Sequence, residues 1–213
     1  SDVYKRQTKH LAVVLARYVT GSASAMGSRN EIGLDNKYIV IDTSGMPDDL
    51  LLPGIFWATD IANDLISGAG GQLSALISDE LWSLVGANSN PLAAGYIQEM
   101  VKTIRGLGGI AITSTQGMQD LFSLDNGKYG KGILDSSRIK IVMQMEEQEA
   151  RLIQNVLNLS EEEVRQITRF RRGEGLLCIG YNHVPIAFYA TQKEYDAITT
   201  SPTDLLKRKE QEV

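Results

Sequence analysis

Three short apolar runs, each followed by polar residues, constrain the fold of this chain more than any other feature. The runs are residues 37–42, 73–79 and 110–116. Between them lie segments with helical patterns, residues 48–67 and 92–105. Alternation of strands and helices is typical of an α/β protein built on a parallel sheet. We therefore expect an α/β fold with a mainly parallel sheet, in which residues 37–42 form a buried strand.

The remaining segments extend this pattern in both directions. Before the first run, residues 8–28 read as a helix that ends in a Gly/Ser-rich stretch. After the third run we expect a short helix over 118–124, a turn over 126–132, a strand over 139–143 and a helix over 147–157. Ser160 and Glu163 have the spacing of a capping box and predict the start of another helix. Residues 175–180 and 184–190 predict a C-terminal β-hairpin.

Composition describes an ordinary soluble protein and excludes several classes. The chain has 213 residues, 21 Lys and Arg against 26 Asp and Glu, a net charge of −5 and one cysteine, Cys178. A protein that binds nucleic acid mainly through phosphates needs clustered positive charge, which this balance does not supply. A single cysteine cannot form an internal disulfide, so a reducing cytoplasm fits best. We find no run of about 20 apolar residues that could span a bilayer.

The domain boundaries that we expect follow from these patterns. Residues 1–7 resemble a translated sequencing-adapter read-through and are excluded from the fold. Residues 8–35 form a helical segment before the core, residues 36–202 form the core, and residues 203–213 form a charged tail. Because the artefact stands at the N-terminus, we expect an N-terminally truncated piece of a longer protein.

Polar side chains stand at the carboxyl ends of the predicted strands, where α/β proteins place their active groups. The second run ends at Asp79 and is followed at once by Glu80, and Gln116 ends the third. Two adjacent acids suit a nucleotide hydrolase, in which one holds Mg²⁺ and the other polarises the attacking water. On spacing alone, an equal alternative is that Asp79 caps the next helix and Glu80 is a solvated residue of its first turn.

An ordered set of segments carries a family resemblance. The segments are Leu76–Leu84, Ile104–Gly109, Thr113–Gln116, Ile133–Ser137 and Arg172–Leu177. Together they resemble the C-terminal motor domain of the conjugal-transfer ATPases of type IV secretion systems, the TraE/TrbE/CagE type. The resemblance implies a RecA-like P-loop NTPase core, ATP and Mg²⁺ as cofactors, and a homo-oligomer, expected to be a hexamer. It also implies other type IV secretion subunits as partners and a cytoplasmic position at the inner face of the membrane, peripheral to the bilayer.

The resemblance also assigns roles to individual residues. Asp79 matches the acid of the Walker B motif that is associated with Mg²⁺, and Glu80 matches the catalytic glutamate. Gln116 matches the glutamine that ends the neighbouring strand near the γ-phosphate, so these three residues would bind the nucleotide. Arg105 lies where the family has basic residues that act on a neighbouring subunit's nucleotide. The alternative for Arg105 is a charge that stabilises a helix C-terminus.

Other conspicuous residues have plainer interpretations. Arg171 and Arg172 are either an intersubunit contact or a solvated pair. Trp57 and Trp82 read as core or interface aromatics rather than cofactor-stacking groups. His10 and His183 are isolated and build no recognised metal site with Cys178.

The sequence departs from the family's pattern at a few positions. Ser78 stands where the family has an apolar strand residue, and Leu81 where it has a small one. The phosphate-binding motif Gly-x₄-Gly-Lys-Ser/Thr does not occur in the printed sequence. The chain would therefore carry the Walker B half of the site, and in the family the missing loop lies upstream.

Three functions follow as hypotheses. The first is an ATP-hydrolysing motor subunit that energises DNA or protein transfer in a conjugative type IV secretion system, with the fragment alone inactive. The second is a DNA-pumping translocase or coupling ATPase of the same fold, which would make contact with DNA. The third is a non-catalytic oligomeric scaffold.

Overall fold

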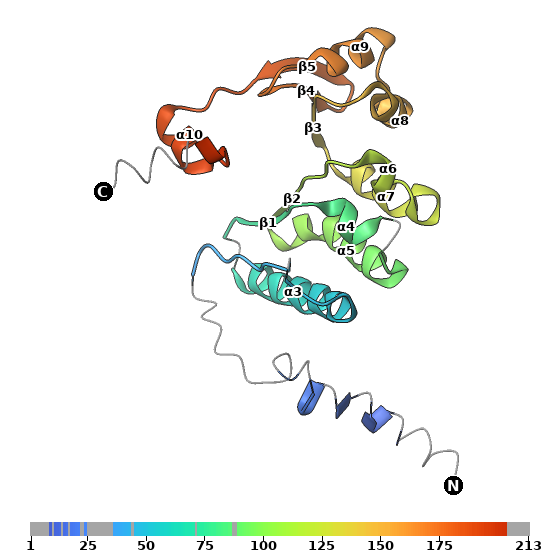
Figure 1. Ribbon diagram of the computed structural model, residues 1–213, viewed down its shortest axis with the longest axis vertical. Helices are drawn as coiled ribbons and strands as arrows, with labels where there is room; N and C mark the ends of the chain where they lie inside the picture. Colours follow the sequence, from blue (N-terminus) through green and yellow to red (C-terminus); the bar gives the residue numbers. More distant parts are fainter. Residues whose placement is uncertain are drawn as a thin grey trace. The chain divides into compact units, whose positions relative to one another are not determined.

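The computed structural model of the chain divides into two compact units, residues 1–68 and 69–213. It describes residues 9, 11–13, 15–16, 18–21, 24, 36–43, 45–70, 72–86 and 89–203. Among the helices that it describes, none has both the length and the apolar character needed to cross a membrane. Figure 1 gives the element labels used below.

The first unit contains one long helix, α3 (Asp48–Gly68), which confirms the helix predicted over 48–67. Leu50, Ile55 and Ile66 are buried on it. The helix expected over 8–28 is present at the described residues 9, 11–13, 15–16, 18–19 and 24. Residues 20 and 21 form a turn and a bend. The other residues of this range lie outside the described part of the chain.

The predicted buried strand at 37–42 is wrong. Residues 38–43 have no regular secondary structure, and Tyr38 and Val40 are 80% and 70% exposed. A strand is stable only when a neighbouring strand takes up its backbone hydrogen bonds. In the described residues of this unit the regular structure is helical, so the β-branched run has no strand to pair with there.

The second unit begins with a parallel pair of strands, β1 (Ser74–Ser78) and β2 (Gly109–Thr113). Their register runs from Ser74 opposite Gly109 to Ser78 opposite Thr113. The connection contains α4 (Leu81–Val85), α5 (Pro91–Thr103) and the 3₁₀ turn η1 (Ile104–Leu107). These elements confirm the strands predicted at 73–79 and 110–116, each shorter than expected, and the helix at 92–105 (Figure 1).

Local chemistry explains why α5 begins and ends where it does. The Asn90 side chain accepts a hydrogen bond from the Leu92 N–H at 2.8 Å, and Pro91 occupies the first helical position, where its missing N–H costs nothing. Gly108 follows η1 with φ of 84°, a backbone conformation that favours glycine, and reverses the chain into β2. These residues thus fix where α5 begins and where the chain enters β2.

Helix α7 (Lys128–Ser136) replaces the turn expected at 126–132, and that prediction was wrong. It follows α6 (Met118–Leu121) and the 3₁₀ turn η2 (Leu124–Gly127). Two glycines lie inside this helix. A Cβ at Gly130 would lie 2.4 Å from the Leu121 carbonyl oxygen, so Gly130 permits close packing there, whereas a Cβ at Gly132 would meet only the amide end of the flexible Gln98 side chain.

A second sheet holds the C-terminal part of the unit. Strands β3 (Ile139–Met143), β4 (Glu174–Ile179) and β5 (Asn182–Ala187) pair antiparallel in that order. This confirms the strand predicted at 139–143 and the C-terminal hairpin. Helices α8 (Glu147–Leu157) and α9 (Glu161–Arg169) are also confirmed, and α9 begins with the Ser160–Glu163 capping box. A further capping box, Thr191 with Glu194, starts α10 (Gln192–Ile198), which we did not predict.

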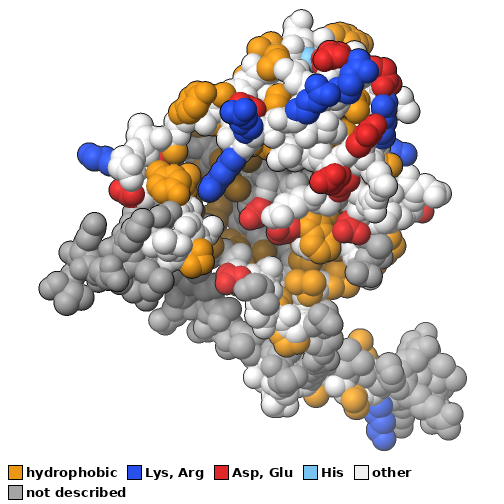
Figure 2. Space-filling view, turned by 45° about the horizontal axis from the view of Figure 1, so that its top comes forward, with side chains coloured by type: hydrophobic (Ala, Val, Ile, Leu, Met, Phe, Trp, Pro, Cys, Tyr) orange, Lys and Arg blue, Asp and Glu red, His pale blue; other side chains and the backbone are white. Residues whose placement is uncertain are grey.

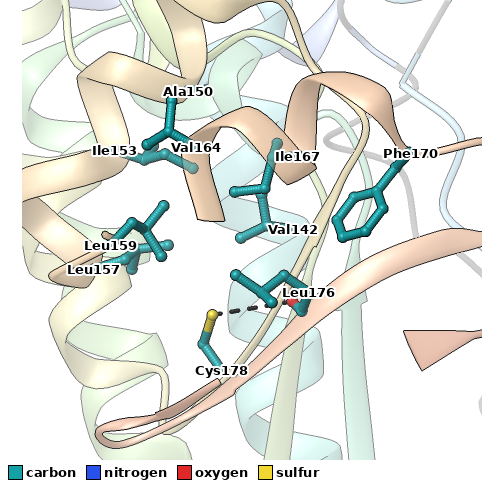
Figure 3. Close-up of a cluster of buried hydrophobic side chains, with 10 residues drawn as sticks. All are labelled: Val142, Ala150, Ile153, Leu157, Leu159, Val164, Ile167, Phe170, Leu176 and Cys178. Atoms are coloured by element: carbon teal, nitrogen blue, oxygen red, sulfur yellow. Dashed lines mark hydrogen bonds between the residues drawn. The ribbon is translucent and has the colours of Figure 1, made fainter. Parts of the chain in front are cut away.

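A hydrophobic core joins this second sheet to its two helices. Figure 3 shows side chains from α8 and α9 lying over Val142, Leu176 and Cys178 of the sheet. Val142 and Leu176 occupy partner positions on β3 and β4, so they point to the same face. Deleting a large buried side chain from such a core costs about 2–5 kcal/mol.

The β1–β2 pair is covered less completely than a parallel sheet usually is. On one face Ile77 is 64% exposed and its partner Ile112 is 49% exposed. Parallel sheets are normally buried on both faces. The Asp79 and Gln116 ends of these strands are also exposed, while Glu80 is half-buried.

Candidate active site

The carboxyl ends of β1 and β2 bring the predicted site residues together. Asp79 and Glu80 follow β1 directly, and Gln116 lies three positions after β2. Hydrogen bonds continue the pairing beyond the strands, because Ser114 N–H donates to the Ser78 carbonyl at 2.9 Å. The Ser114 carbonyl in turn accepts from the Leu81 N–H at 2.8 Å. The two loops are therefore fixed against each other at this edge.

Glu80 is the centre of the resulting cluster. Gln116 Nε2 donates to Glu80 Oε1 at 2.8 Å, and the indole N–H of Trp82 donates to Glu80 Oε2. Glu80 is also the N-cap residue of α4, with φ of 53° and ψ of 45°. A left-handed conformation is uncommon for a residue with a Cβ and is found mostly where the surroundings hold it.

Asp79 makes a different set of contacts. Its Oδ1 oxygen accepts from the Ser114 hydroxyl and from the Glu80 N–H, the latter at 3.0 Å. In the described part of the chain, no hydrogen bond is made by its Oδ2 oxygen. The alternative that Asp79 caps α4 does not hold, because Glu80 occupies the N-cap and no side chain caps that helix.

The donor set suits a hard divalent cation. Carboxylate and hydroxyl oxygens from Asp79, Glu80 and Ser114 are the ligands that Mg²⁺ prefers, and Mg²⁺ is usually held by one or two carboxylates together with water and substrate phosphates. Among the described residues, no group of three or more His, Cys, Asp or Glu side chains could hold a metal by itself. The residues present therefore fit Mg²⁺ that is shared with a bound phosphate.

Arg105 is not part of this cluster. It lies in η1, before β2, whereas Gln116 lies after β2. The five residues of β2 separate the two ends by about 16 Å, at 3.3 Å per residue. Arg171 and Arg172 are exposed at the turn before β4, where the Arg171 backbone N–H donates to Glu174 Oε2 at 2.8 Å.

Two members of the cluster were missed by sequence reasoning. Trp82 was interpreted as a core or interface aromatic, and Ser114 was seen only as part of a polar strand end. The indole N–H, a donor that needs a partner when it is half-buried, was the available signal for Trp82. For Ser114 the signal was its position two residues before Gln116, since alternate residues of an extended chain share a face.

His183 belongs to the second sheet and not to this site. Its Nδ1 lies 2.7 Å from Glu163 Oε1, and its side chain is 9% exposed. Partial burial by itself would raise the pKa of the Glu163 carboxyl. Hydrogen bonds from Ser160 and the contact with His183 outweigh that effect, so the pKa is lowered overall. Burial, with the nearby Glu163 charge, raises the pKa of the Cys178 thiol, which fits an inert core cysteine.

Comparison with known proteins places this geometry in a family. Residues 11–206 match the TraG P-loop domain. The chain belongs to the TraG P-loop domain family. The resemblance to conjugal-transfer ATPases of type IV secretion systems is thereby confirmed at the level of the family, and so is the P-loop NTPase type of α/β fold.

Solved structures support the same assignment. The structure of VirB4 of Thermoanaerobacter pseudethanolicus is 26% identical to this family member, with a TM-score of 0.75, and the match covers 87% of this chain and 50% of that one. The chain thus spans about half the length of this relative. The genome packaging NTPase B204 from Sulfolobus turreted icosahedral virus 2, in complex with ATP-gammaS, has a TM-score of 0.51 at 19% identity, over 72% of this chain and 68% of that one, and shows the fold alone. A comparison with the curated proteins found no match.

Proposed function

We propose that the chain carries the Walker B half of the catalytic site of an ATP-hydrolysing motor subunit of a conjugative type IV secretion system. The observation that carries the proposal is the contact between Gln116 and Glu80, which joins two parallel strand ends beside Asp79. Membership of the TraG P-loop domain family and the similarity to VirB4 support the choice of nucleotide and of system.

The three side chains divide the work by their contacts. Asp79, with Oδ1 held by Ser114 and Glu80, would bind Mg²⁺ through its other carboxylate oxygen. Glu80 is the general base that orients and polarises the attacking water, a role that typically contributes 10²–10⁴-fold to a rate. Gln116 keeps one amide N–H on Glu80 and has a second for the γ-phosphate. Mg²⁺, when bound, neutralises charge that develops on the phosphates.

Arg105 has a role only between subunits in this proposal. Because β2 separates it from Gln116, it would act on the nucleotide of a neighbouring protomer in a homo-oligomer, which we propose to be a hexamer. The assembly would work with other type IV secretion subunits at the inner, cytoplasmic face of the membrane. The phosphate-binding loop would come from sequence upstream of this chain.

The first test reads the native locus upstream of codon 8. A strand, a Gly-rich loop with Lys-Ser/Thr and a helix in frame would complete the site. A start codon just upstream without such a loop would reject the ATPase proposal and favour the non-catalytic scaffold.

The second test is Glu80→Gln in the complete protein, followed by ATP turnover and nucleotide retention. The variant should bind ATP, retain it and turn over at least about 10²-fold more slowly. Glu99→Gln, on the exposed side of α5, is the matched control and should keep wild-type turnover. Equal turnover in wild type and Glu80→Gln would reject the assignment of Glu80.

A DNA-pumping translocase is the alternative enzyme. Figure 2 shows Lys and Arg side chains interspersed with Asp and Glu side chains on the visible face, and the chain carries a net charge of −5. A motor that tracks DNA would instead show hydrolysis that DNA stimulates in a salt-sensitive way. Hydrolysis that does not respond to DNA between about 50 and 200 mM salt favours the secretion motor.

A further inference from the structure

The indole of Trp82 makes a contact that a core aromatic does not need to make. Trp82 is the second residue of α4 and is half-buried. Its Nε1–H donates to Glu80 Oε2, two positions earlier in the chain. Because Gln116 already donates to Oε1, both oxygens of this carboxylate are held by N–H donors, one from each loop of the site.

The backbone at Glu80 is held as firmly as its side chain. Its left-handed conformation carries a steric cost, since φ is 53° and the residue has a Cβ. Three contacts oppose that cost: the Glu80 N–H donates to Asp79, and the Glu80 carbonyl accepts from the N–H and the hydroxyl of Ser83 at 2.9 and 2.8 Å. The conformation aims the carboxylate back across the strand ends toward Gln116.

We propose that Trp82 is a positioning residue for Glu80, fixing the orientation of the carboxylate that activates water. This inference rests on the proposed ATPase function. A carboxylate held at one oxygen only can rotate about its terminal torsion, which has a broad energy profile. With the indole on Oε2 and the amide of Gln116 on Oε1, that rotation is stopped and the plane of the group is set.

The hydrogen bond also explains why tryptophan, rather than another aromatic residue, suits position 82. Phenylalanine would fill the same space as most of the indole but donate no hydrogen bond. Histidine would donate from a shorter ring. Among the aromatic side chains, tryptophan and histidine carry an N–H donor, and the indole holds its N–H farther from the backbone, so the residue type at this position serves the donor as well as the apolar area.

A spectroscopic experiment tests the contact without ATP. The chain has two tryptophans, Trp57 and Trp82, so its ¹H–¹⁵N spectrum contains two indole resonances, and Trp57→Phe assigns them. We expect the Trp82 indole proton downfield of the Trp57 proton, and Glu80→Gln should move it upfield while leaving Trp57 in place. A Trp82 resonance unmoved by Glu80→Gln would overturn the contact and the proposal.

A kinetic experiment tests the role in the complete protein. Trp82→Phe, and replacement of Trp82 by 3-benzothienylalanine, which keeps the bicyclic shape and lacks the N–H, should each lower kcat about tenfold, as expected for a lost hydrogen bond, with little change in KM for ATP. Trp57→Phe is the control, since Trp57 makes none of the hydrogen bonds described for the site, and should keep wild-type kcat.

The outcomes separate this inference from the function on which it rests. Wild-type kcat in the 3-benzothienylalanine protein would overturn the positioning role and leave the ATPase intact. A loss in Trp82→Phe that 3-benzothienylalanine restores would show that shape alone matters, and would also overturn it. A wild-type complete protein that does not hydrolyse ATP would overturn the proposed function, and the positioning role with it, while the indole resonance still decides whether the contact exists.

Discussion

Gln116 donates to Glu80 across 2.8 Å although the two residues are 36 positions apart in the chain. The contact exists because β1 and β2 run parallel and in register, so that their carboxyl ends lie side by side. Asp79 and Ser114 make a second contact across the same two ends. Two hydrogen bonds between side chains of opposite loops therefore fix how the residues at this edge are arranged.

We expect Ser114 to affect the binding of Mg²⁺ rather than the activation of the attacking water. Its hydroxyl donates to the Asp79 oxygen that also accepts from the Glu80 N–H, so it orients a proposed metal-binding carboxylate. Loss of such a supporting contact typically weakens metal binding about 10–100-fold. We expect Ser114→Ala to raise the Mg²⁺ concentration for half-maximal ATP hydrolysis by at least about tenfold. Ser136→Ala, whose hydroxyl bonds an exposed helix carbonyl, should change nothing, and an unshifted Mg²⁺ curve for Ser114→Ala would contradict this role.

Gly130 should tolerate no side chain. Its added Cβ would approach the Leu121 carbonyl oxygen to 2.4 Å, and backbone cannot move aside cheaply. Gly130→Ala should lower the free energy of unfolding by about 1–3 kcal/mol. Gly95→Ala is the matched control, because its Cβ would lie 3.7 Å from Tyr129 Cε1, and it should be neutral or stabilising by up to about 1 kcal/mol. Urea unfolding measures both, and equal effects would contradict the packing argument.

Part of the architecture was predictable because it is encoded locally. The helix at 147–157 and the capping box of Ser160 and Glu163 need only neighbouring residues, and both are present. Thr191 and Glu194 repeat that box and would have predicted α10. Helix α7 was missed because Gly130 packs against the backbone of Leu121, a tertiary contact that no local pattern reveals.

The residues of the candidate site fall into the same two groups, those that the sequence reveals and those that only the fold reveals. Asp79, Glu80 and Gln116 could be singled out because each follows an apolar run, and the structure brings them together. The contact of Ser114 with Asp79 depends on how the two loops face each other, so sequence alone could not supply it. The contact of Trp82 with Glu80 is local, but it accompanies a left-handed backbone at Glu80 that the residue types do not predict. The run at 37–42 has the composition of a strand, but composition does not provide a strand to pair with.

Replacing Thr115 by valine should leave the stability of the protein unchanged or increase it. Its hydroxyl is buried and has no hydrogen-bond partner among the described residues. An unsatisfied buried hydroxyl is costly, so Thr115→Val should be neutral or stabilise the protein by about 1–2 kcal/mol. Thr59 is the contrasting case, since its buried hydroxyl donates to the Ile55 carbonyl at 2.7 Å, and Thr59→Val should destabilise by about 1 kcal/mol. Thermal unfolding decides, and a loss of stability in Thr115→Val would contradict this account.

Glu163 should make stability depend on acid pH. Its pKa is lowered in the folded protein from the ordinary 4.5, so its contribution is present above that value and is lost as the pH falls through the folded pKa. The difference in urea midpoint between wild type and Glu163→Gln should be large at pH 7 and smaller at pH 3.5. Glu162, exposed and paired with Arg165, is the control and should give a small difference at both values. A Glu163→Gln difference that does not change with pH would contradict the assignment.

The coupling between Glu80 and Gln116 tests the central claim most directly. It is measured by a double-mutant cycle of ATP hydrolysis in the complete protein, with Glu80→Ala, Gln116→Ala and both together. If the two side chains form one hydrolytic unit, as their 2.8 Å contact indicates, the double variant should be little slower than Glu80→Ala, with a coupling of at least about 1 kcal/mol. If the losses in kcat simply multiply, the two residues act independently and the proposed site is wrong.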